Sequence, residues 1–196
     1  MTKVITNLKF LRIELVRKSI HFLIALSPVM AMFNRPFTII FLMMGVLSYV
    51  YMESLRLKGF SIPLISSLTA QASRPRDEGH FVIGPVTLGL GALLVLMFFP
   101  LQTATIAIYA LAFGDGFASL VGKPFGRLRP SFMCGKSVEG SLACFFAVFI
   151  SAWSVSHNLI ISLVASFTAA LVEALPLEDF DNMAIPFAVA LLVSLI

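Results

Sequence analysis

An uncharged run from Phe81 to Gly114 constrains the fold of this chain more than any other feature. It holds 34 consecutive residues without an acid, a lysine or an arginine, whereas a helix needs only about 20 apolar residues to cross a bilayer. The run is therefore too long for one membrane span. Pro100 lies within it, and we expect this proline to divide the run into two helices.

The composition indicates an integral membrane protein and excludes an ordinary soluble domain. Hydrophobic residues make up 59% of the chain and charged residues 12%, while soluble domains usually carry about a quarter charged residues. Two cysteines, Cys134 and Cys144, indicate neither a disulfide framework nor a metal site. The net charge of +4 first reports topology in a membrane protein, so no nucleic-acid partner is expected.

The apolar segments predict an all-α, polytopic bundle of about seven transmembrane helices that forms a single domain over residues 1–196. The last segment has only 14 residues and contains Pro186, so a re-entrant piece is the alternative to a short span there. The first two predicted segments are Ser19–Phe33 and Phe37–Leu55. The third and fourth are the two parts of the uncharged run, which divides at Pro100, and the fourth extends to Val121. Ser156-His157-Asn158 divides Ser141–Val172 into the fifth and sixth, and Met183–Ile196 is the seventh.

The charges predict the topology of such a bundle. With seven spans, 13 of the 14 lysines and arginines fall on the side of the N-terminus, and only Arg35 lies opposite. The positive-inside rule makes that side cytoplasmic. We therefore expect a cytoplasmic N-terminus, a location in the cytoplasmic membrane, and an active-site face formed by loops 56–80, 122–140 and 173–182.

Asp115 stands between Gly114 and Gly116 at the end of an apolar run. A carboxylate at membrane depth is costly and suggests function by default. One interpretation is a Mg²⁺ ligand, because Mg²⁺ prefers one or two carboxylates together with phosphate oxygens and water. The other is a helix-end acid paired with an arginine. The helix face of Asp115 is small enough to admit phosphate or another helix: Ala118, Ser119 and Gly122 follow at i+3, i+4 and i+7.

The basic loop after Asp115 offers cations and glycines to a phosphate. Gly135-Lys136-Ser137 is similar to the end of a Walker A loop, but Pro130 occupies the first glycine position and no strand precedes it, so that interpretation fails. A looser hypothesis remains, in which Lys136 contacts phosphate and Glu139 holds metal or orients a hydroxyl. The alternative is a basic loop that touches anionic lipid.

Further charged residues gather near the predicted helix ends. Glu14, Arg17, Lys18 and His21 follow at i, i+3, i+4 and i+7, so they share one helix face; this face is either a juxtamembrane patch or part of a site. Glu53 and Arg56, at i and i+3, could simply pair. Other acids and amides near helix ends include Glu78, Glu173, Asp181 and Asn182, and for either of the last two an N-cap role is also possible.

The chain resembles the dolichol kinase/phytol kinase family of CTP-dependent membrane lipid kinases. The matching pieces keep their order over most of the chain. They are Glu14-Leu15-Val16-Arg17-Lys18-Ser19-Ile20-His21, Glu78 with Gly84, Phe113-Gly114-Asp115-Gly116-Phe117-Ala118, Gly122, Gly126-Arg127, Lys136-Ser137-Val138-Glu139-Gly140-Ser141, and Glu173 with Asp181-Asn182.

The resemblance implies transfer of the CTP γ-phosphoryl group to the hydroxyl of a membrane lipid, with Mg²⁺ as cofactor. It implies catalytic roles for Asp115, Lys136, Glu139 and Glu173, with Asp115 and Glu139 as the Mg²⁺ ligands. Glu78, Asp181 and Asn182 would lie on the acceptor side, and Glu173, Asp181 and Glu78 each remain possible as the base. The implied nucleotide and phosphate contacts are Arg17, Lys18, His21, Gly114, Gly116, Ser119, Gly122, Lys123, Gly126, Arg127, Ser137 and Gly140.

Two other functions compete with this hypothesis. A CTP:phosphatidate cytidylyltransferase would also join CTP to a lipid, but it would form a CDP-lipid. A membrane carrier would place acids and broken helices deep in the bilayer, whereas the charges here gather at one face. The residues alone choose neither the lipid, among polyprenols, shorter isoprenoid alcohols and diacylglycerol, nor CTP over ATP, nor the oligomeric state.

Overall fold

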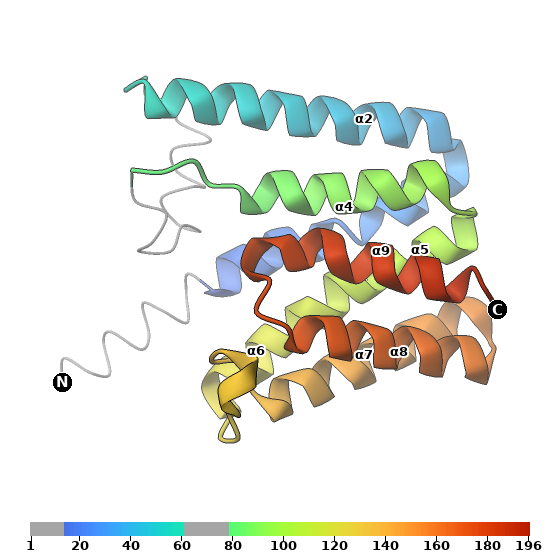
Figure 1. Cartoon of the computed structure of the whole chain (residues 1–196). Coiled ribbons are helices and arrows are strands. Elements are labelled where there is room, and N and C mark those ends of the chain that lie inside the picture. Colours follow the sequence, from blue (N-terminus) through green and yellow to red (C-terminus); the bar gives the residue numbers. More distant parts are fainter. Residues whose placement is uncertain (1–13, 61–78) are drawn as a thin grey trace.

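The computed structural model describes residues 14–60 and 79–196, and within these ranges it contains helices and no strand (Figure 1). The predicted all-α class is therefore confirmed for this part of the chain. Helices occupy each of the predicted apolar segments, and several of their ends differ from the predicted ones.

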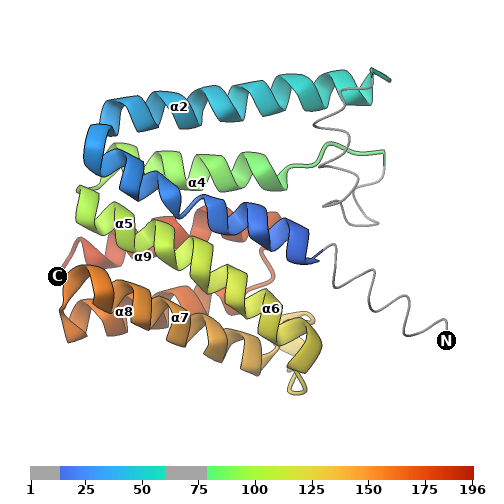
Figure 2. The same ribbon diagram turned by 180° about the vertical axis from the view of Figure 1, so that it is seen from behind.

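A sharp break at Asn34 separates the first two predicted segments, Ser19–Phe33 and Phe37–Leu55. Residues 14–23 are helical, and a turn at 24–25 leads into α2 (Leu26–Leu57). Asn34 is non-helical, with φ −155° and ψ 97°. Its side-chain oxygen accepts a hydrogen bond from the Phe37 N–H at 3.0 Å, as an N-cap does, and Pro36 has no N–H to leave unsatisfied. The chain reverses here, where the sequence predicted a break (Figure 2).

The long uncharged run also divides as predicted. α4 (Gly84–Phe98) ends before Pro100, and α5 (Leu101–Tyr109) follows it. The Arg35 guanidinium closes the C-terminus of α4 by donating to the Leu96 carbonyl at 2.8 and 2.6 Å and to the Phe99 carbonyl at 2.7 Å. This arrangement places a cation on the carbonyls that a helix end leaves unpaired.

α5 continues without interruption into a π-helix, η2 (Ala110–Asp115), and then into α6 (Gly116–Phe125). The predicted end at Val121 was wrong, because the helix includes Pro124 in its last turn. The loop thus begins at Gly126 rather than at Gly122. It contains the short 3₁₀ helix η3 (Ser131–Met133).

The C-terminal part forms three antiparallel helices. α7 (Val138–Ser156) starts earlier than predicted because the Ser137 side chain caps it. His157, with φ 49°, ends α7, and Asn158 caps α8 (Leu159–Ala174). The 3₁₀ helix η4 (Glu178–Phe180) leads into α9 (Asp181–Val193).

These helices pack as a bundle in which α2 is an outer layer (Figures 1 and 2). α2 packs against α4, α4 against α9, α9 against α8, and α7 against both α8 and α6. Residues 14–33 and α9 lie on opposite faces of the bundle, as the two views agree. Small side chains let the helices approach closely; fully buried examples are Ala92, Ala107, Ala152, Ala165 and Ala169.

The helix lengths support a membrane protein. Three helical stretches in the described ranges are long and apolar enough to cross a membrane, Glu14–Leu57, Leu101–Phe125 and Val138–Ser156, while α4 and α8 are shorter apolar helices. The count of seven spans and the cytoplasmic N-terminus stay predictions. The same end of the bundle carries the ends of α6 and α8 and the starts of α4, α7 and α9 (Figure 1).

Candidate active site

A buried ion pair joins the first helix to the end of η2. The Lys18 ammonium lies 2.5 Å from Asp115 Oδ2, and the two residues are 2% and 6% exposed. His21 Nε2 lies 3.0 Å from the same oxygen. Within the described residues both contacts use Oδ2 of Asp115. Two residues of the predicted helix face, Lys18 and His21, thus meet the predicted membrane carboxylate.

The π-helix takes part in this arrangement. His21 Nε2 also lies 3.1 Å from the Leu111 carbonyl, which belongs to η2. Because both neighbours of Nε2 are acceptors, we assign the hydrogen of the imidazole to Nε2. His21 is therefore a donor to Asp115 and to the helix backbone. π-bulges of this kind are frequent at functional sites.

Glycines around Asp115 permit close packing rather than forming an open loop. A Cβ on Gly116 would lie 2.5 Å from the Phe22 ring, and one on Gly114 would lie 2.8 Å from Val148 and 3.1 Å from the Cys144 sulfur. The helix of residues 14–23 thus closely approaches the start of α6, and α7 closely approaches η2. Both glycines set the position of Asp115.

A second polar group surrounds Lys136, which precedes α7. The Lys136 ammonium donates to the Glu173 carbonyl and lies 3.7 Å from Glu173 Oε1 and 3.6 Å from Asp181 Oδ2. The Ser141 hydroxyl donates to Glu173 Oε2 at 2.9 Å. This group joins the loop before α7, the end of α8 and the start of α9.

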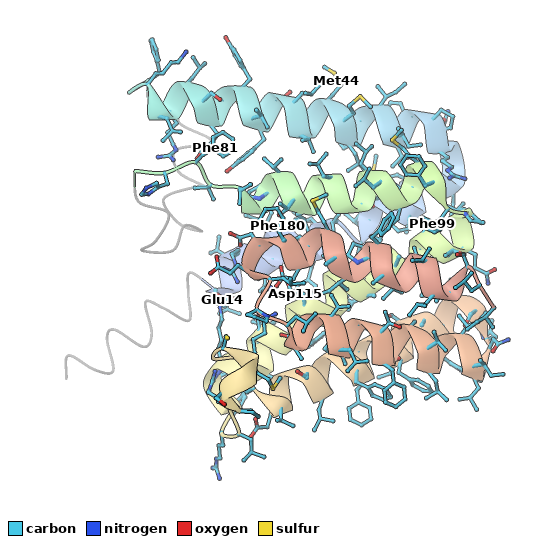
Figure 3. The ribbon with its side chains drawn as sticks, viewed as in Figure 1. Glu14, Met44, Phe81, Phe99, Asp115 and Phe180 are labelled. Atoms are coloured by element: carbon cyan, nitrogen blue, oxygen red, sulfur yellow. The ribbon has the colours of Figure 1, made fainter. Side chains whose placement is uncertain are left out.

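The two groups adjoin, because η2 packs against α7, α8 and α9. Asp181 lies outside the three candidate spans. Burial and, to a smaller extent, the negative charge of Asp115 raise the pKa of Asp181 to about 7, although the charges of Lys136 and Lys18 oppose that rise. We name the six residues Lys18, His21, Asp115, Lys136, Glu173 and Asp181 the charge cluster. Asp115 and Glu14 lie at the same end of the bundle (Figure 3).

Glu14 holds two of the predicted phosphate-binding residues. Its carboxylate is buried, accepts from Arg17 at 2.7 Å and pairs with Lys123 of α6. Arg17 and Lys123 remain partly exposed, at 22% and 30% of their side chains. Both cations therefore stand at the rim of the charge cluster.

Side chains brace the basic loop onto the ends of α6 and α7. Glu139 accepts from the Arg127 N–H at 2.9 Å and from the Leu128 N–H at 3.1 Å. The Arg129 guanidinium donates to the carbonyls of Gly122 and Gly135. Glu139 thus holds the loop backbone, and its role as a Mg²⁺ ligand stays a prediction. The Arg127 side chain is exposed.

The small face of α6 is filled by α7. A Cβ on Gly140 would lie 2.9 Å from the Ala118 carbonyl and 3.2 Å from the Gly122 Cα, and one on Gly126 would lie 2.3 Å from Ser137 Oγ. Of the two possibilities that the sequence allowed, the structure places a helix there. Ser119 lies half-buried on α6.

The predicted acceptor-side residues have different positions. Asp181 belongs to the charge cluster. The Asn182 amide is directed to α4, where it donates to the Gly84 carbonyl at 3.3 Å and to Thr87 Oγ1 at 3.0 Å. Phe180 occupies the N-cap position of α9 without a capping bond. Neither Asp181 nor Asn182 is therefore the N-cap that the sequence allowed. Glu78 lies outside the described residues.

The carboxylates fit a Mg²⁺ ion that arrives with a phosphate ligand. Among the described residues no three His, Cys, Asp or Glu side chains gather to hold a metal ion by themselves. Nucleotide-bound Mg²⁺ needs only one or two carboxylates, since phosphates and water complete its coordination. Asp115, which lies beside Lys18 in the charge cluster, is the carboxylate that we assign to such an ion.

Sequence reasoning missed the roles of two contributors, Ser141 and the Leu111 carbonyl. Ser141, which orients Glu173, was quoted only as the end of a motif. The Leu111 carbonyl had no sequence signal, because a backbone acceptor depends on the π-helix. Glu14 was named on the helix face of Arg17, but its pairing with Lys123 of α6 was not predicted.

Comparisons with known proteins identify relatives that are named as lipid kinases. The chain is 32% identical to a phytol kinase of Synechocystis over 162 residues, which cover 76% of this chain and 66% of that protein. It is 30% identical to a CTP-dependent diacylglycerol kinase 1 of Eremothecium gossypii over 137 residues, which cover 57% of this chain and 43% of that protein. Phytol kinase 1 of Arabidopsis thaliana is 27% identical over 155 residues, 69% of this chain and 50% of that protein. The chain thus spans less than two thirds of each relative, and no family model or solved structure matches it.

Proposed function

This chain is homologous to CTP-dependent diacylglycerol kinases and phytol kinases, as its resemblance to the dolichol kinase/phytol kinase family implied, and on that premise we propose that it is a CTP-dependent lipid kinase. It transfers the γ-phosphoryl group of CTP to the hydroxyl of a membrane lipid. The observation that carries the proposal is the charge cluster, in which Lys18 and Lys136 face three carboxylates at one end of a membrane bundle.

Phosphoryl transfer requires positioning and neutralisation of charge more than covalent chemistry. Lys18, on the helix of residues 14–23, supplies one positive charge beside Asp115, and Lys136, in the loop before α7, supplies a second beside Glu173 and Asp181. Arg17 and Lys123 at the rim, with the exposed Arg127 of the adjoining loop, meet the outer phosphates and the nucleoside. His21 holds Asp115 in place through the Nε2 hydrogen.

Mg²⁺, bound with CTP, would neutralise phosphate charge and would be held by Asp115. The second proposed ligand, Glu139, already accepts two backbone N–H groups, but each carboxylate oxygen has more than one lone pair. Gly114 and Gly116 keep Asp115 close to both neighbouring helices.

We assign the general base to Asp181. Its pKa of about 7 suits a group that accepts a proton near neutral pH, and it lies beside Lys136 at a helix start. Glu173 is bound by Ser141 and by Lys136, and we assign it to orienting Lys136. The lipid is an alcohol such as phytol, a polyprenol or diacylglycerol, and its headgroup enters at the polar end of the bundle.

The decisive assay uses purified protein, Mg²⁺, CTP labelled at the γ-phosphate and a panel of phytol, farnesol, polyprenol and diacylglycerol. Label in one lipid, lost in Asp115→Asn and Lys136→Ala and on chelation of Mg²⁺, would support the kinase and name its substrate. Arg35→Gln, which removes a cap at the far end of the bundle, is the matched control and should retain turnover. CDP-diacylglycerol formed from CTP and phosphatidate, without labelled alcohol, would refute the kinase in favour of a cytidylyltransferase. A folded protein that forms neither product would refute both and leave a carrier.

A further inference from the structure

Glu53 is a buried carboxylate that the proposed reaction does not use. Beyond the break at Asn34, α2 buries only Thr38 and Glu53, and the rest of this stretch is partly or fully exposed. The Glu53 side chain is 0% exposed. A buried charge on the outermost helix of a membrane bundle is expensive unless it is fully paired, so its contacts indicate its purpose.

Glu53 pairs with more than its neighbour on the helix. Arg56 donates to both carboxylate oxygens at 2.8 Å, which is the pairing that the i, i+3 spacing allowed. In addition, Glu53 Oε1 accepts the Val82 N–H at 2.9 Å, and Arg56 donates to the His80 carbonyl at 2.9 Å. The Tyr49 hydroxyl donates to the Val82 carbonyl at 3.1 Å. Glu53 and Arg56, which we call the α2 clamp, therefore hold the backbone just before α4.

The clamped segment leads directly to the charge cluster. Gly84 begins α4 two residues after Val82, and the Asn182 amide donates to its carbonyl and to Thr87. A Cβ on Gly91 would lie 2.1 Å from the Asn182 carbonyl, so α4 and the start of α9 are in close contact. Asp181, the preceding residue, faces Lys136 at 3.6 Å. The position of Asp181 thus depends on where α4 begins.

We infer that Glu53 and Arg56 are positioning residues for phosphoryl transfer: through residues 80–84 and Asn182 they fix Asp181 opposite Lys136. The inference rests on the proposed function. It predicts that weakening the α2 clamp lowers turnover although no clamp residue touches the charge cluster in the described structure. Misplacement of a reacting group by about 1 Å is enough to lower a rate by up to about a hundredfold.

The test compares Glu53→Gln and Arg56→Lys with Arg35→Gln in the full-length protein. Glu53→Gln keeps the size of the side chain but loses its charge, and Arg56→Lys keeps the charge but loses the forked donor. We expect kcat with γ-labelled CTP to fall about tenfold or more in Glu53→Gln and less in Arg56→Lys, with KM for CTP within about twofold of wild type. Arg35→Gln should lower the thermal midpoint without this loss of kcat.

A double-mutant cycle with Asn182→Ala tests the route. If the α2 clamp acts through Asn182, the fold-loss of kcat in the double variant Glu53→Gln with Asn182→Ala will be smaller than the product of the fold-losses in the two single variants. Hydrogen exchange supplies a readout that needs no activity: Glu53→Gln should speed exchange at residues 80–84 and also at 179–184. If the wild type transfers no phosphate and Glu53→Gln still speeds exchange in both segments, the proposed function is refuted but the α2 clamp is not. Wild-type kcat in Glu53→Gln, or faster exchange confined to residues 80–84, would refute the inference.

Discussion

The buried pair between Lys18 and Asp115 allows stability and activity to be separated. Both groups are less than 10% exposed, so neither is solvated well enough to tolerate loss of its partner. Removing one member of a buried ion pair usually costs about 3–5 kcal/mol, since the remaining charge stays buried without compensation. We therefore expect Lys18→Met and Asp115→Asn each to lower the free energy of unfolding by about this amount.

The double variant Lys18→Met with Asp115→Asn should behave differently. It leaves no uncompensated charge, and His21 keeps an acceptor in the Leu111 carbonyl and in the new amide. Replacement of a whole buried pair is often close to neutral. We expect the double variant to recover most of the lost stability while its lipid kinase activity stays at background, because phosphate then lacks the Lys18 charge and Mg²⁺ lacks a ligand.

The measurement is an unfolding curve in detergent for the wild type and the three variants, with the γ-labelled CTP assay on the same preparations. A double variant as unstable as the single ones would show that the pair is not the buried, coupled unit described here. A double variant that regains stability and also activity would show that Lys18 and Asp115 only support the fold.

Two further predictions follow from close contacts and from charge. Gly91→Ala should lower the free energy of unfolding by about 1–3 kcal/mol through overpacking, and should lower activity, because its Cβ would lie 2.1 Å from the Asn182 carbonyl. Gly45→Ala, which has nothing within 4 Å of its Cβ, should be neutral or slightly stabilising. Equal effects of the two variants in thermal unfolding would contradict the packing of α4 against α9. Because Asp181 is protonated below its pKa of about 7, kcat/KM of the wild type should rise as the pH passes through this value. In Asp181→Asn, kcat/KM should be at least about a hundredfold lower and should not show that rise. An unchanged pH profile in this variant would exclude Asp181 as the base.

The sequence predicted the helices well because strong local signals mark their ends. Pro100 separates α4 from α5, and Asn34 with Pro36 breaks α2, since each alters backbone bonding whatever its surroundings. The end at Val121 was predicted wrongly for a related reason: the composition becomes polar at Gly122, but Pro124 is tolerated within the last turn of α6. Polarity alone therefore did not mark the end of this helix.

The site was predictable in its members but not in their pairing. The spacing of Lys18 and His21 put them on one face, and Asp115 was conspicuous as an acid in an apolar run. Their contact depends on how the helix of residues 14–23 crosses η2, and no local pattern reports the π-turn that presents the Leu111 carbonyl. In the same way, Glu139 follows Lys136 closely in sequence, yet Glu139 holds the loop backbone while the partners of Lys136 come from α8 and α9.

The pairing of every lysine in the charge cluster with a carboxylate has a consequence for selectivity. A membrane surface presents anionic headgroups at high local concentration, and two bare ammonium groups would bind them continuously. Here an incoming anion must take a lysine away from Glu173, Asp181 or Asp115 and leave a buried negative charge behind. An anion that brings its own divalent cation would compensate that charge, so we expect the cluster to favour a metal-bound polyphosphate over the much more abundant lipid phosphates around it.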